Sequence, residues 1–159
     1  MSAIVRPATA DDVVQLGKYS AQLTALHHHW DPDRFIAASE MAPTGYGGYL
    51  VKQIDKPGNV VLVVEEDGAA VAYCWGAIEG NDYMALRGPA GEIYDIFVDE
   101  DRRREGLGRL LINATIAALK ALGAPQIVLS TAHKNEAGQR LFASVGMRPT
   151  MVEMTLTVR

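Results

Sequence analysis

The sequence has very little cysteine. Its 159 residues include one cysteine, Cys74, so a disulfide within the chain and a cysteine-rich zinc site are both excluded. Cys74 lies in the apolar run Val71–Trp75, where a small buried side chain is expected rather than a nucleophile. A chain of this length can hold itself together by its hydrophobic core, and we expect a single domain over residues 1–159.

Long apolar runs and an excess of positive charge are also missing. No stretch approaches the about 20 apolar residues that a membrane span needs, and Met1–Arg6 has no apolar core of a secretory signal. The formal net charge of −4 argues against general nucleic-acid binding, which needs a basic face. We therefore expect a cytoplasmic protein with neither a membrane nor a nucleic acid as its partner.

The spacing of apolar residues predicts an α/β (α+β) fold with one mixed central sheet and helices on both faces. Glu66-Asp67-Gly68 is a strong hairpin signal between two β-rich runs. The segment 43–48, which contains a proline and three glycines, is expected to be a loop. The expected elements are a strand at 3–7, helices at 13–26 and 34–36, helical turns at 49–54, strands at 60–65, 69–78 and 92–98, a helix at 106–122, a strand at 126–130, a helix at 135–145, and a final strand at 151–158.

The segment Arg103–Gly108 carries the clearest chemical signal. It lies between a predicted strand and a predicted helix, where glycines let the backbone approach an anion and the first helical N–H groups are unpaired. Four arginines gather there in an otherwise acidic protein: Arg102, Arg103, Arg104 and Arg109. No Gly-Lys-Ser/Thr follows and the three-glycine dinucleotide fingerprint is absent. An anion site of another kind is predicted, and a tight turn is the alternative.

Two motifs identify a family. Arg103, Gly106 and Gly108 match the pattern Arg/Gln-x-x-Gly-x-Gly/Ala. Asn135–Phe142, followed by Gly146-Met147, is similar to Asn-x-x-Ala-x-x-Leu-Tyr-x-x-x-Gly-Phe. With this separation and element order, the chain resembles the GNAT superfamily of acetyl-CoA-dependent N-acetyltransferases, strongly over residues 92–148.

The resemblance implies a cofactor and a reaction. Acetyl-CoA would be the cosubstrate, no metal would be needed, and the acetyl group would pass directly to a primary amine of a small molecule or peptide. A non-catalytic acyl-CoA-binding module with the same fold is the alternative. Many relatives are homodimers, so the resemblance is compatible with one here. The residues expected to bind the cofactor are Ile96, Phe97, Val98, Arg103, Arg104, Glu105, Gly106, Leu107, Gly108, Arg109, Asn135 and Phe142.

The chain departs from the family pattern at two positions. Phe142 stands where the family usually has a tyrosine, the proposed proton donor to the leaving thiolate, and phenylalanine has no proton to give. Gly138 replaces the usual alanine, which weakens the helix slightly and permits close approach of the cofactor. The proton-donor role is therefore empty or filled by another group.

The base that would deprotonate the amine is expected on strand 92–98. Strict alternation would place Glu92, Tyr94, Ile96 and Val98 on one face and Ile93, Asp95 and Phe97 on the other. Asp95 is flanked by apolar residues, so burial would raise its pKa toward a useful range. Asp95 is the first candidate base, Tyr94 is a catalytic candidate as a proton donor, and Glu92 is a weaker candidate. The alternative for Asp95 is a buried structural carboxylate.

Other polar residues carry weaker signals. His27–His29 are consecutive, so on a helix they point in different directions and do not form a metal site. His133 is expected on an exposed loop. The long loop Gly80–Pro89 and the region Leu26–Tyr49 are expected to form the wall of the acceptor site. The residues there that could contact an acceptor are Trp30, Tyr46, Tyr83 and Arg87.

Overall fold

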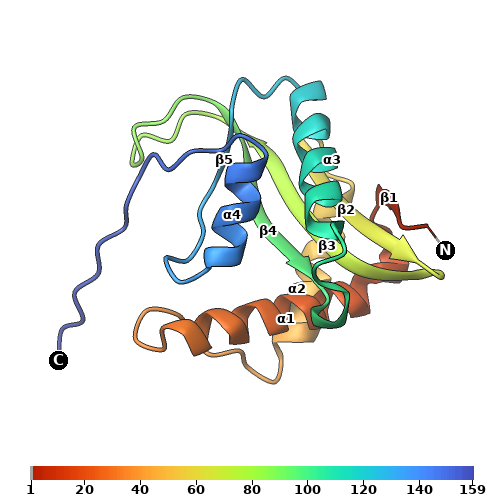
Figure 1. Ribbon diagram of the computed structural model, residues 1–159, viewed down its shortest axis with the longest axis horizontal. Coiled ribbons are helices and arrows are strands. Elements are labelled where there is room, and N and C mark those ends of the chain that lie inside the picture. The colour runs from red at the N-terminus through yellow and green to blue at the C-terminus, as the bar shows by residue number, and fades with distance from the viewer. Residues whose placement is uncertain (1) are drawn as a thin grey trace.

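The computed structural model of the protein describes residues 2–159. Within these residues, no helix is both long and apolar enough to cross a membrane. The elements, drawn in Figure 1, are β1 (Ile4–Pro7), a 3-10 turn (Ala10–Asp12), α1 (Val13–Trp30), α2 (Ala42–Ile54), β2 (Asn59–Glu66), β3 (Ala69–Glu79), β4 (Ala90–Val98), a second 3-10 turn (Glu100–Arg102), α3 (Leu107–Ala121), β5 (Ile127–Leu129) and α4 (Glu136–Ser144).

The five strands form one sheet in the order β1-β2-β3-β4-β5. β1 to β4 are antiparallel neighbours, and β5 runs parallel to β4. In the turn between β2 and β3, Asp67 has φ 51° and Gly68 has φ 80°, the left-handed pair that a tight hairpin requires. The prediction of a hairpin here is confirmed, and so is the mixed character of the sheet.

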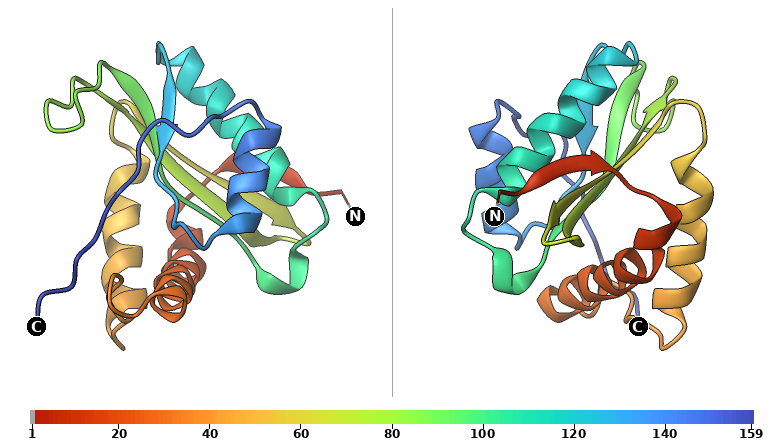
Figure 2. Two further views of the ribbon diagram at one scale, coloured as in Figure 1. Left: turned by 60° about the vertical axis from the view of Figure 1, so that its left-hand side comes forward. Right: turned by 90° about the vertical axis from the view of Figure 1, so that its right-hand side faces the viewer.

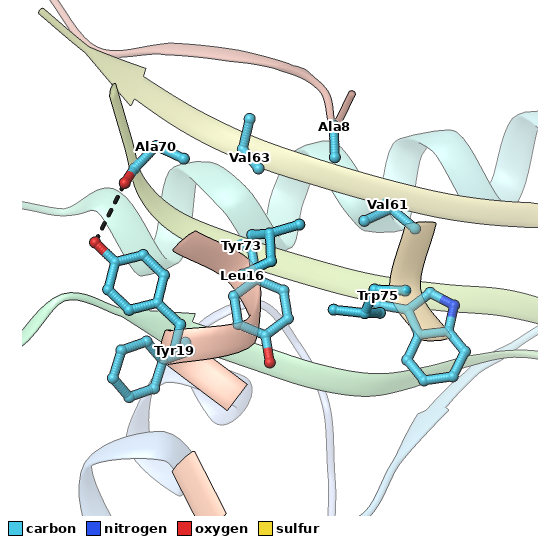
Figure 3. Close-up of a cluster of buried hydrophobic side chains, with 10 residues drawn as sticks. Ala8, Leu16, Tyr19, Val61, Val63, Ala70, Tyr73 and Trp75 are labelled. Carbon is cyan, nitrogen blue, oxygen red and sulfur yellow. Dashed lines mark hydrogen bonds between the residues drawn. The ribbon is translucent and has the colours of Figure 1, made fainter. Parts of the chain in front are cut away.

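Apolar side chains fill one core on each face of the sheet. On one face, α1 and α2 contribute Leu16, Tyr19 and other side chains that pack on Tyr73 of β3 (Figure 3). On the opposite face, α3 and α4 contribute Leu111 and Phe142 to the second core. Figure 2 shows the two helix pairs on either side of the sheet. The predicted placement of helices on both faces is confirmed.

Helix α2 begins earlier than the sequence indicates, and the predicted loop at 43–48 is wrong. Pro43 lies in the first turn of α2, a position that tolerates its missing N–H. The glycines allow α1 and α2 to pack closely, since a Cβ on Gly17 would lie 2.0 Å from the Pro43 carbonyl oxygen. A Cβ on Gly47 would similarly meet the Val13 carbonyl oxygen at 2.7 Å. The predicted helix at 34–36 is also wrong, because these residues lie in the connection between α1 and α2.

A β-bulge in β4 changes which side chains share a face. Trp75 of β3 pairs with Asp95, but its neighbour Gly76 pairs with Ile93, so Tyr94 is an extra residue on β4. Tyr94 consequently packs on Trp75, on the same face as Asp95. Ile93 contributes to the opposite core. Relative to Ile96 and Val98, the strict alternation predicted for this strand is therefore wrong for Glu92, Ile93 and Tyr94.

The final strand predicted at 151–158 is not formed. These residues carry no regular secondary structure and are all exposed. The alternating apolar pattern that predicts a strand is present, but within residues 2–159 no strand of the sheet pairs with this segment. Alternation shows that a segment suits a sheet, whereas strand formation also requires a neighbouring strand to supply hydrogen bonds.

Candidate active site

β4 and β5 stop pairing part of the way along β4. β5 pairs with β4 only at Gly91, Glu92 and Ile93, whereas β4 continues to Val98. The β4 backbone beyond Ile93 therefore has an edge free of β5, and such an edge can pair with an extended ligand.

The predicted cofactor-binding side chains of β4 lie on both faces of the sheet. Ile96 and Val98 pack against the core under α3 and α4. Phe97 belongs to the core under α1 and α2 and contacts the ring of Tyr19, with centroids 5.1 Å apart. Phe97 can therefore meet a ligand on the α3 side only through its backbone.

The connection from β4 to α3 takes the shape that the sequence predicts for an anion site. Arg104 has φ 68° and Gly106 has φ 80°, so both adopt the left-handed conformation. Gly106 is the N-terminal cap residue of α3, and a Cβ there would meet nothing within 4 Å. Glycine is thus favoured by conformation rather than by space. Leu107 buries its side chain in the core, which leaves its N–H at the unpaired first turn of α3.

The charged residues of this connection have different partners. Arg102 is paired with Glu66 and with Glu105, so it is largely neutralised. Arg103 turns back, and its Nε donates to the Val98 carbonyl oxygen at 3.1 Å. Arg104 is exposed, and Arg109 approaches the end of α4 with a bond of 3.4 Å to the Ser144 carbonyl oxygen. Among residues 2–159, Arg103, Arg104 and Arg109 therefore have no carboxylate partner, and of these three only Arg103 is turned back onto β4.

The second motif lies beside the same helix end. A Cβ on Gly108 would lie 3.2 Å from the Leu141 side chain of α4. Glycine at this position therefore allows α3 and α4 to approach each other. Asn135 caps α4 by accepting a bond of 3.0 Å from the Gly138 N–H, and it donates to Thr131 at 3.0 Å. A Cβ on Gly138 would lie 2.3 Å from the Asn135 amide nitrogen. Glycine at 138 therefore leaves room for the Asn135 side chain that caps α4. The sequence alone does not reveal this reason for the glycine.

Phe142 is 7% exposed and belongs to the core between α3, α4 and the sheet. The position that usually carries a hydroxyl in the family thus packs as an ordinary apolar side chain.

The carboxyl group of Asp95 lies on the α1 and α2 face with two tyrosines around it. The hydroxyl of Tyr46 on α2 donates to Oδ2, and the hydroxyl of Tyr73 on β3 donates to the same oxygen at 3.2 Å. Within residues 2–159, no hydrogen bond reaches Oδ1 of Asp95. One oxygen is therefore fixed by the protein, and the other can accept a proton from a ligand.

Burial raises the pKa of Asp95 above its ordinary value, and hydrogen bonds from Tyr46 and Tyr73 together with the nearby His27 oppose that rise. Burial and the Asp95 charge raise the pKa of both tyrosines well above the usual range. The tyrosines therefore stay protonated and act as donors. A raised pKa is what a carboxylate needs to take a proton from an amine near neutral pH.

Tyr94 takes part in a separate interaction. Its hydroxyl donates to Glu79, and its ring lies 4.5 Å from that of Trp75. Burial and Glu79 raise the pKa of Tyr94. A hollow of about 410 Å³ adjoins it, and Glu79, Asp82, Arg87 and Glu92 help to line this hollow. Arg87 and Glu92 are paired at 3.3 Å, so the hollow keeps an acidic character from Glu79 and Asp82.

Several side chains that the sequence suggests as reactive lie outside this group. Cys74 is fully buried, and burial raises its pKa to about 12, which suits a core thiol rather than a nucleophile. His133 is exposed. His27 and His28 bond to the carbonyl oxygens of Leu23 and Phe35. Among residues 2–159, no group of three His, Cys, Asp or Glu side chains could hold a metal ion.

Sequence reasoning misses three residues of the site: Tyr73, Trp75 and Glu79, all on β3. They lie at odd-numbered positions of the strand, so their side chains face the same side of the sheet. A register prediction for the hairpin formed by β3 and β4 would have placed Tyr73 and Trp75 near Asp95. The ten-residue connection Gly80–Pro89 gives no such register, because long loops do not fix strand pairing as two-residue turns do.

The comparisons with known proteins agree with this geometry. A model of the Acetyltransferase (GNAT) family matches residues 20–147. The mycothiol acetyltransferase of Thermobispora bispora is 34% identical over 97 residues, which cover 58% of this chain and 31% of that protein. The chain thus matches less than a third of the length of that relative.

Solved structures give a similar result. A mutant of the BH1408 protein from Bacillus halodurans has a TM-score of 0.84 and 27% identity, with 98% of this chain and 99% of that chain covered. AAC(6')-Iy, in complex with the bisubstrate analogue CoA-S-monomethyl-acetylneamine, has a TM-score of 0.76 and 16% identity, with 100% of this chain and 99% of that chain covered. The latter shows a shared fold. Since the family match spans the divergent strands, the loop before α3 and helix α4, the chain belongs to the GNAT family of acetyltransferases.

Proposed function

We propose that this chain is an N-acetyltransferase that moves the acetyl group of acetyl-CoA directly to a primary amine of a small molecule or peptide. We also propose that residues 1–159 form a single domain for this purpose. The observation that carries the proposal is the divergence of β4 from β5 after Ile93. It brings a free backbone edge next to the start of α3, and Asp95 lies on the same strand.

The cofactor would lie along this edge. The pyrophosphate would accept hydrogen bonds from the N–H groups of Gly106, Leu107 and Gly108 at the N-terminus of α3, where the helix dipole favours anions. Arg104 and Arg109 would add positive charge. The pantetheine arm would pair with the backbone of Ile96–Val98, and a backbone N–H there would stabilise the oxyanion. In this arrangement Asn135 and Arg103 hold the protein scaffold in place.

The reaction would follow from the position of Asp95. The neutral amine nitrogen attacks the thioester carbonyl carbon, and the C–N bond forms as the carbonyl oxygen becomes an oxyanion. The C–S bond then breaks as the carbonyl re-forms. Asp95 Oδ1 takes the proton lost by the nitrogen, directly or through water. The CoA sulfur leaves as a thiolate and takes a proton from solvent or from Tyr94. Because the conjugate thiol has a pKa of about 8.5, no protein acid is required at that step, which is compatible with Phe142.

The acceptor side has a chemistry that favours a cationic amine. Glu79 and Asp82 border the hollow next to Tyr94, and the aromatic rings of Tyr49 and Trp75 pack nearby. Carboxylates attract an ammonium group before it loses its proton. The names of the relatives, a mycothiol acetyltransferase and AAC(6')-Iy bound to an acetylneamine analogue, support a small amine over a large partner.

A binding module without turnover is the second candidate, and Phe142 favours it. Its ring fills the core at the position where the family usually has a tyrosine. Such a protein would bind acetyl-CoA and leave it intact, because it would have no need of a base or a proton donor.

Release of free CoA separates the two functions. Purified protein with acetyl-CoA is incubated with amino acids, polyamines, aminoglycosides and peptides, and thiol release is compared with a reaction without amine. We expect amine-dependent release for at least one class, and mass spectrometry should find the acetylated amine. Binding of acetyl-CoA by calorimetry with no amine-dependent release in any class would favour the binding module. Failure to bind acetyl-CoA would contradict both.

A further inference from the structure

A second carboxylate lies on the same face of the sheet as Asp95. Glu79 is the last residue of β3, and strand alternation places its side chain on the α1 and α2 side. The hydroxyl of Tyr94 donates to Glu79 Oε1. Among residues 2–159, no basic side chain forms an ion pair with Glu79, whereas Arg87 neutralises the neighbouring Glu92. A half-buried carboxylate without a cation favours the binding of a positively charged ligand.

A row of aromatic rings connects Asp95 with Glu79. In order, the row consists of Tyr46, Tyr49, Trp75 and Tyr94. The centroids of successive rings are 6.0, 5.6 and 4.5 Å apart. The hydroxyl at one end of the row donates to Asp95, and the hydroxyl at the other end donates to Glu79. Tyr49 and Tyr94 are 47% and 37% exposed, so a ligand can reach their rings, which suit both methylene and ammonium groups.

The distance between the two carboxylates follows from the strand geometry. Asp95 pairs with Trp75 across β3 and β4, and Glu79 lies four residues further along β3. At about 3.3 Å per residue, the two positions are about 13 Å apart along the strand. A nitrogen that binds each carboxylate lies within about 3 Å of it, so two nitrogens of one ligand would be roughly 8–13 Å apart. Because an extended chain advances about 3.3–3.6 Å for every three bonds, about seven to eleven bonds cover this distance.

The hollow of about 410 Å³ lies at the Glu79 end of this row. One wall of the hollow is formed by the loop Gly80–Pro89, which projects beyond the ends of β3 and β4 (Figure 1). Backbone hydrogen bonds of 2.8 and 2.9 Å between Asp82 and Arg87 close the loop into a hairpin. Asp82 Oδ1 also accepts two backbone N–H bonds of 2.9 and 3.0 Å within the loop. The loop is therefore an ordered wall, and it adds a second carboxylate beside Glu79.

We propose that the acceptor is a long linear diamine or polyamine, in which one amine receives the acetyl group beside Asp95 and a second amine stays protonated and binds Glu79. This inference rests on the proposed function, because the acetylated end is placed by Asp95. The methylene chain between the two nitrogens would lie on the rings of Tyr49 and Tyr94. The second ammonium would donate to Glu79 Oε2 and contact the face of the Tyr94 ring, which combines an ion pair with a cation–π contact.

Matched amines of different length test the inference. Linear α,ω-diaminoalkanes of four to twelve carbons and the n-alkylamines of the same carbon number are compared by the release of CoA from acetyl-CoA. We expect kcat/KM to be at least about tenfold higher for diaminooctane than for octylamine, the effect of one charge-assisted hydrogen bond. The advantage should disappear at diaminobutane, whose two nitrogens cannot reach both carboxylates. Equal kcat/KM for diamines and monoamines at every length would overturn the inference and leave the proposed function in place.

Glu79→Gln separates the second ammonium site from the acetylated end. Glutamine keeps the shape and can still accept the hydrogen bond from Tyr94, but it carries no charge. We expect the ratio of kcat/KM between diaminooctane and octylamine to fall about tenfold. Asp67→Asn is the matched control, because it removes the same charge at the other end of β3, where the left-handed position tolerates asparagine, and it should keep the wild-type ratio. An unchanged ratio in Glu79→Gln would overturn the assignment of the second ammonium to Glu79.

Calorimetry with protein saturated with CoA measures the site without turnover. Diaminooctane should bind this complex about tenfold more tightly than octylamine, and Glu79→Gln should remove the difference. If the preference is found and no amine is acetylated, the second ammonium site stands and the proposed acetyltransferase function fails. If amines are acetylated and neither binding nor kcat/KM prefers the diamine, the inference is wrong and the function stands. Absence of both binding and acetylation across the series would contradict the two together.

Discussion

The two faces of β4 are built in different ways. On the α3 side, the groups proposed to hold the cofactor come from two short stretches of sequence, 96–98 and 104–109, and most act through backbone atoms. On the α1 side, the Asp95 carboxyl depends on side chains from three separate elements, Tyr46 of α2, Tyr73 of β3 and its own strand. The first face is a local structure, whereas the second exists only when the whole sheet and α2 are assembled.

This difference predicts how each face responds to mutation. Changes on the α3 side should alter cofactor affinity and leave the rate with bound cofactor nearly unchanged. Changes around Asp95 should alter the rate and its pH dependence, with little effect on cofactor affinity. A variant that changes both the cofactor affinity and the rate with bound cofactor would contradict this separation of the two faces.

The largest effect is expected for Asp95→Asn. The amide keeps the shape and can still accept bonds from Tyr46 and Tyr73, but it cannot take a proton. We expect kcat to fall by about 10²–10⁴, with acetyl-CoA affinity unchanged by calorimetry. Because the folded-state pKa of Asp95 is raised, the carboxylate costs stability once the pH exceeds that pKa. The melting temperature of Asp95→Asn should therefore hold or rise at neutral pH, and a clear fall with full activity would make Asp95 a structural carboxylate.

A charge at Gly106 probes the other face. Gly106→Asp and Gly106→Asn have the same shape, and both residue types tolerate the left-handed conformation better than most, so they differ in charge alone. We expect Gly106→Asp to bind acetyl-CoA up to about 30-fold more weakly than Gly106→Asn, equivalent to ~2 kcal/mol at a helix N-terminus. Calorimetry at low salt measures this difference. Equal acetyl-CoA affinities of the two folded variants would show that the pyrophosphate does not bind at the start of α3.

The tyrosines of the α1 side should tune the pH dependence. The wild-type rate should fall as pH drops through the raised pKa of Asp95, since the base becomes protonated. Tyr46→Phe and Tyr73→Phe each remove a donor that stabilises the carboxylate, so the acidic limb of the pH–rate profile should move to higher pH by up to about one unit. Tyr49→Phe is the control, because Tyr49 contacts Trp75 through its ring. If the acidic limb of the pH–rate profile does not move in Tyr46→Phe or in Tyr73→Phe, Asp95 is not the titrating base.

The smallest effect is expected for Phe142→Tyr. The added hydroxyl enters a core position and costs up to about 1–3 kcal/mol if it finds no partner, which thermal melting would detect. The rate should hold or rise, because a positioned acid can assist thiolate departure but is not required. A large loss of kcat in a folded variant would show that Phe142 packs where no hydroxyl is tolerated, and that residue 142 does not correspond to the tyrosine of the family's second motif.

The two faces also differ in how far the sequence predicts them. The glycines and arginines of 103–109 indicate the shape of the connection because left-handed positions and helix starts are local properties. Asp95 is found from its apolar neighbours. Tyr73 is not found, and Tyr46 is expected only as an acceptor contact, because the distance of each from Asp95 depends on strand register and on α2. The bulge at Tyr94 and the close contact of Gly47 with α1 arise in the same way from pairing between distant residues. The strand predicted at 151–158 is wrong, because an alternating apolar pattern does not form a strand without a neighbouring strand.

The short pairing of β5 with β4 has a consequence for hydrogen isotope exchange. Backbone amides that face the divergence have no partner in β5, so they should exchange with deuterated solvent faster than the β4 amides bonded to β3. A ligand that pairs with this edge would slow them. Peptides covering 94–98 thus offer a readout of site occupancy that needs neither turnover nor knowledge of the acceptor, and candidate amines could be ranked by the additional protection they give in the presence of CoA.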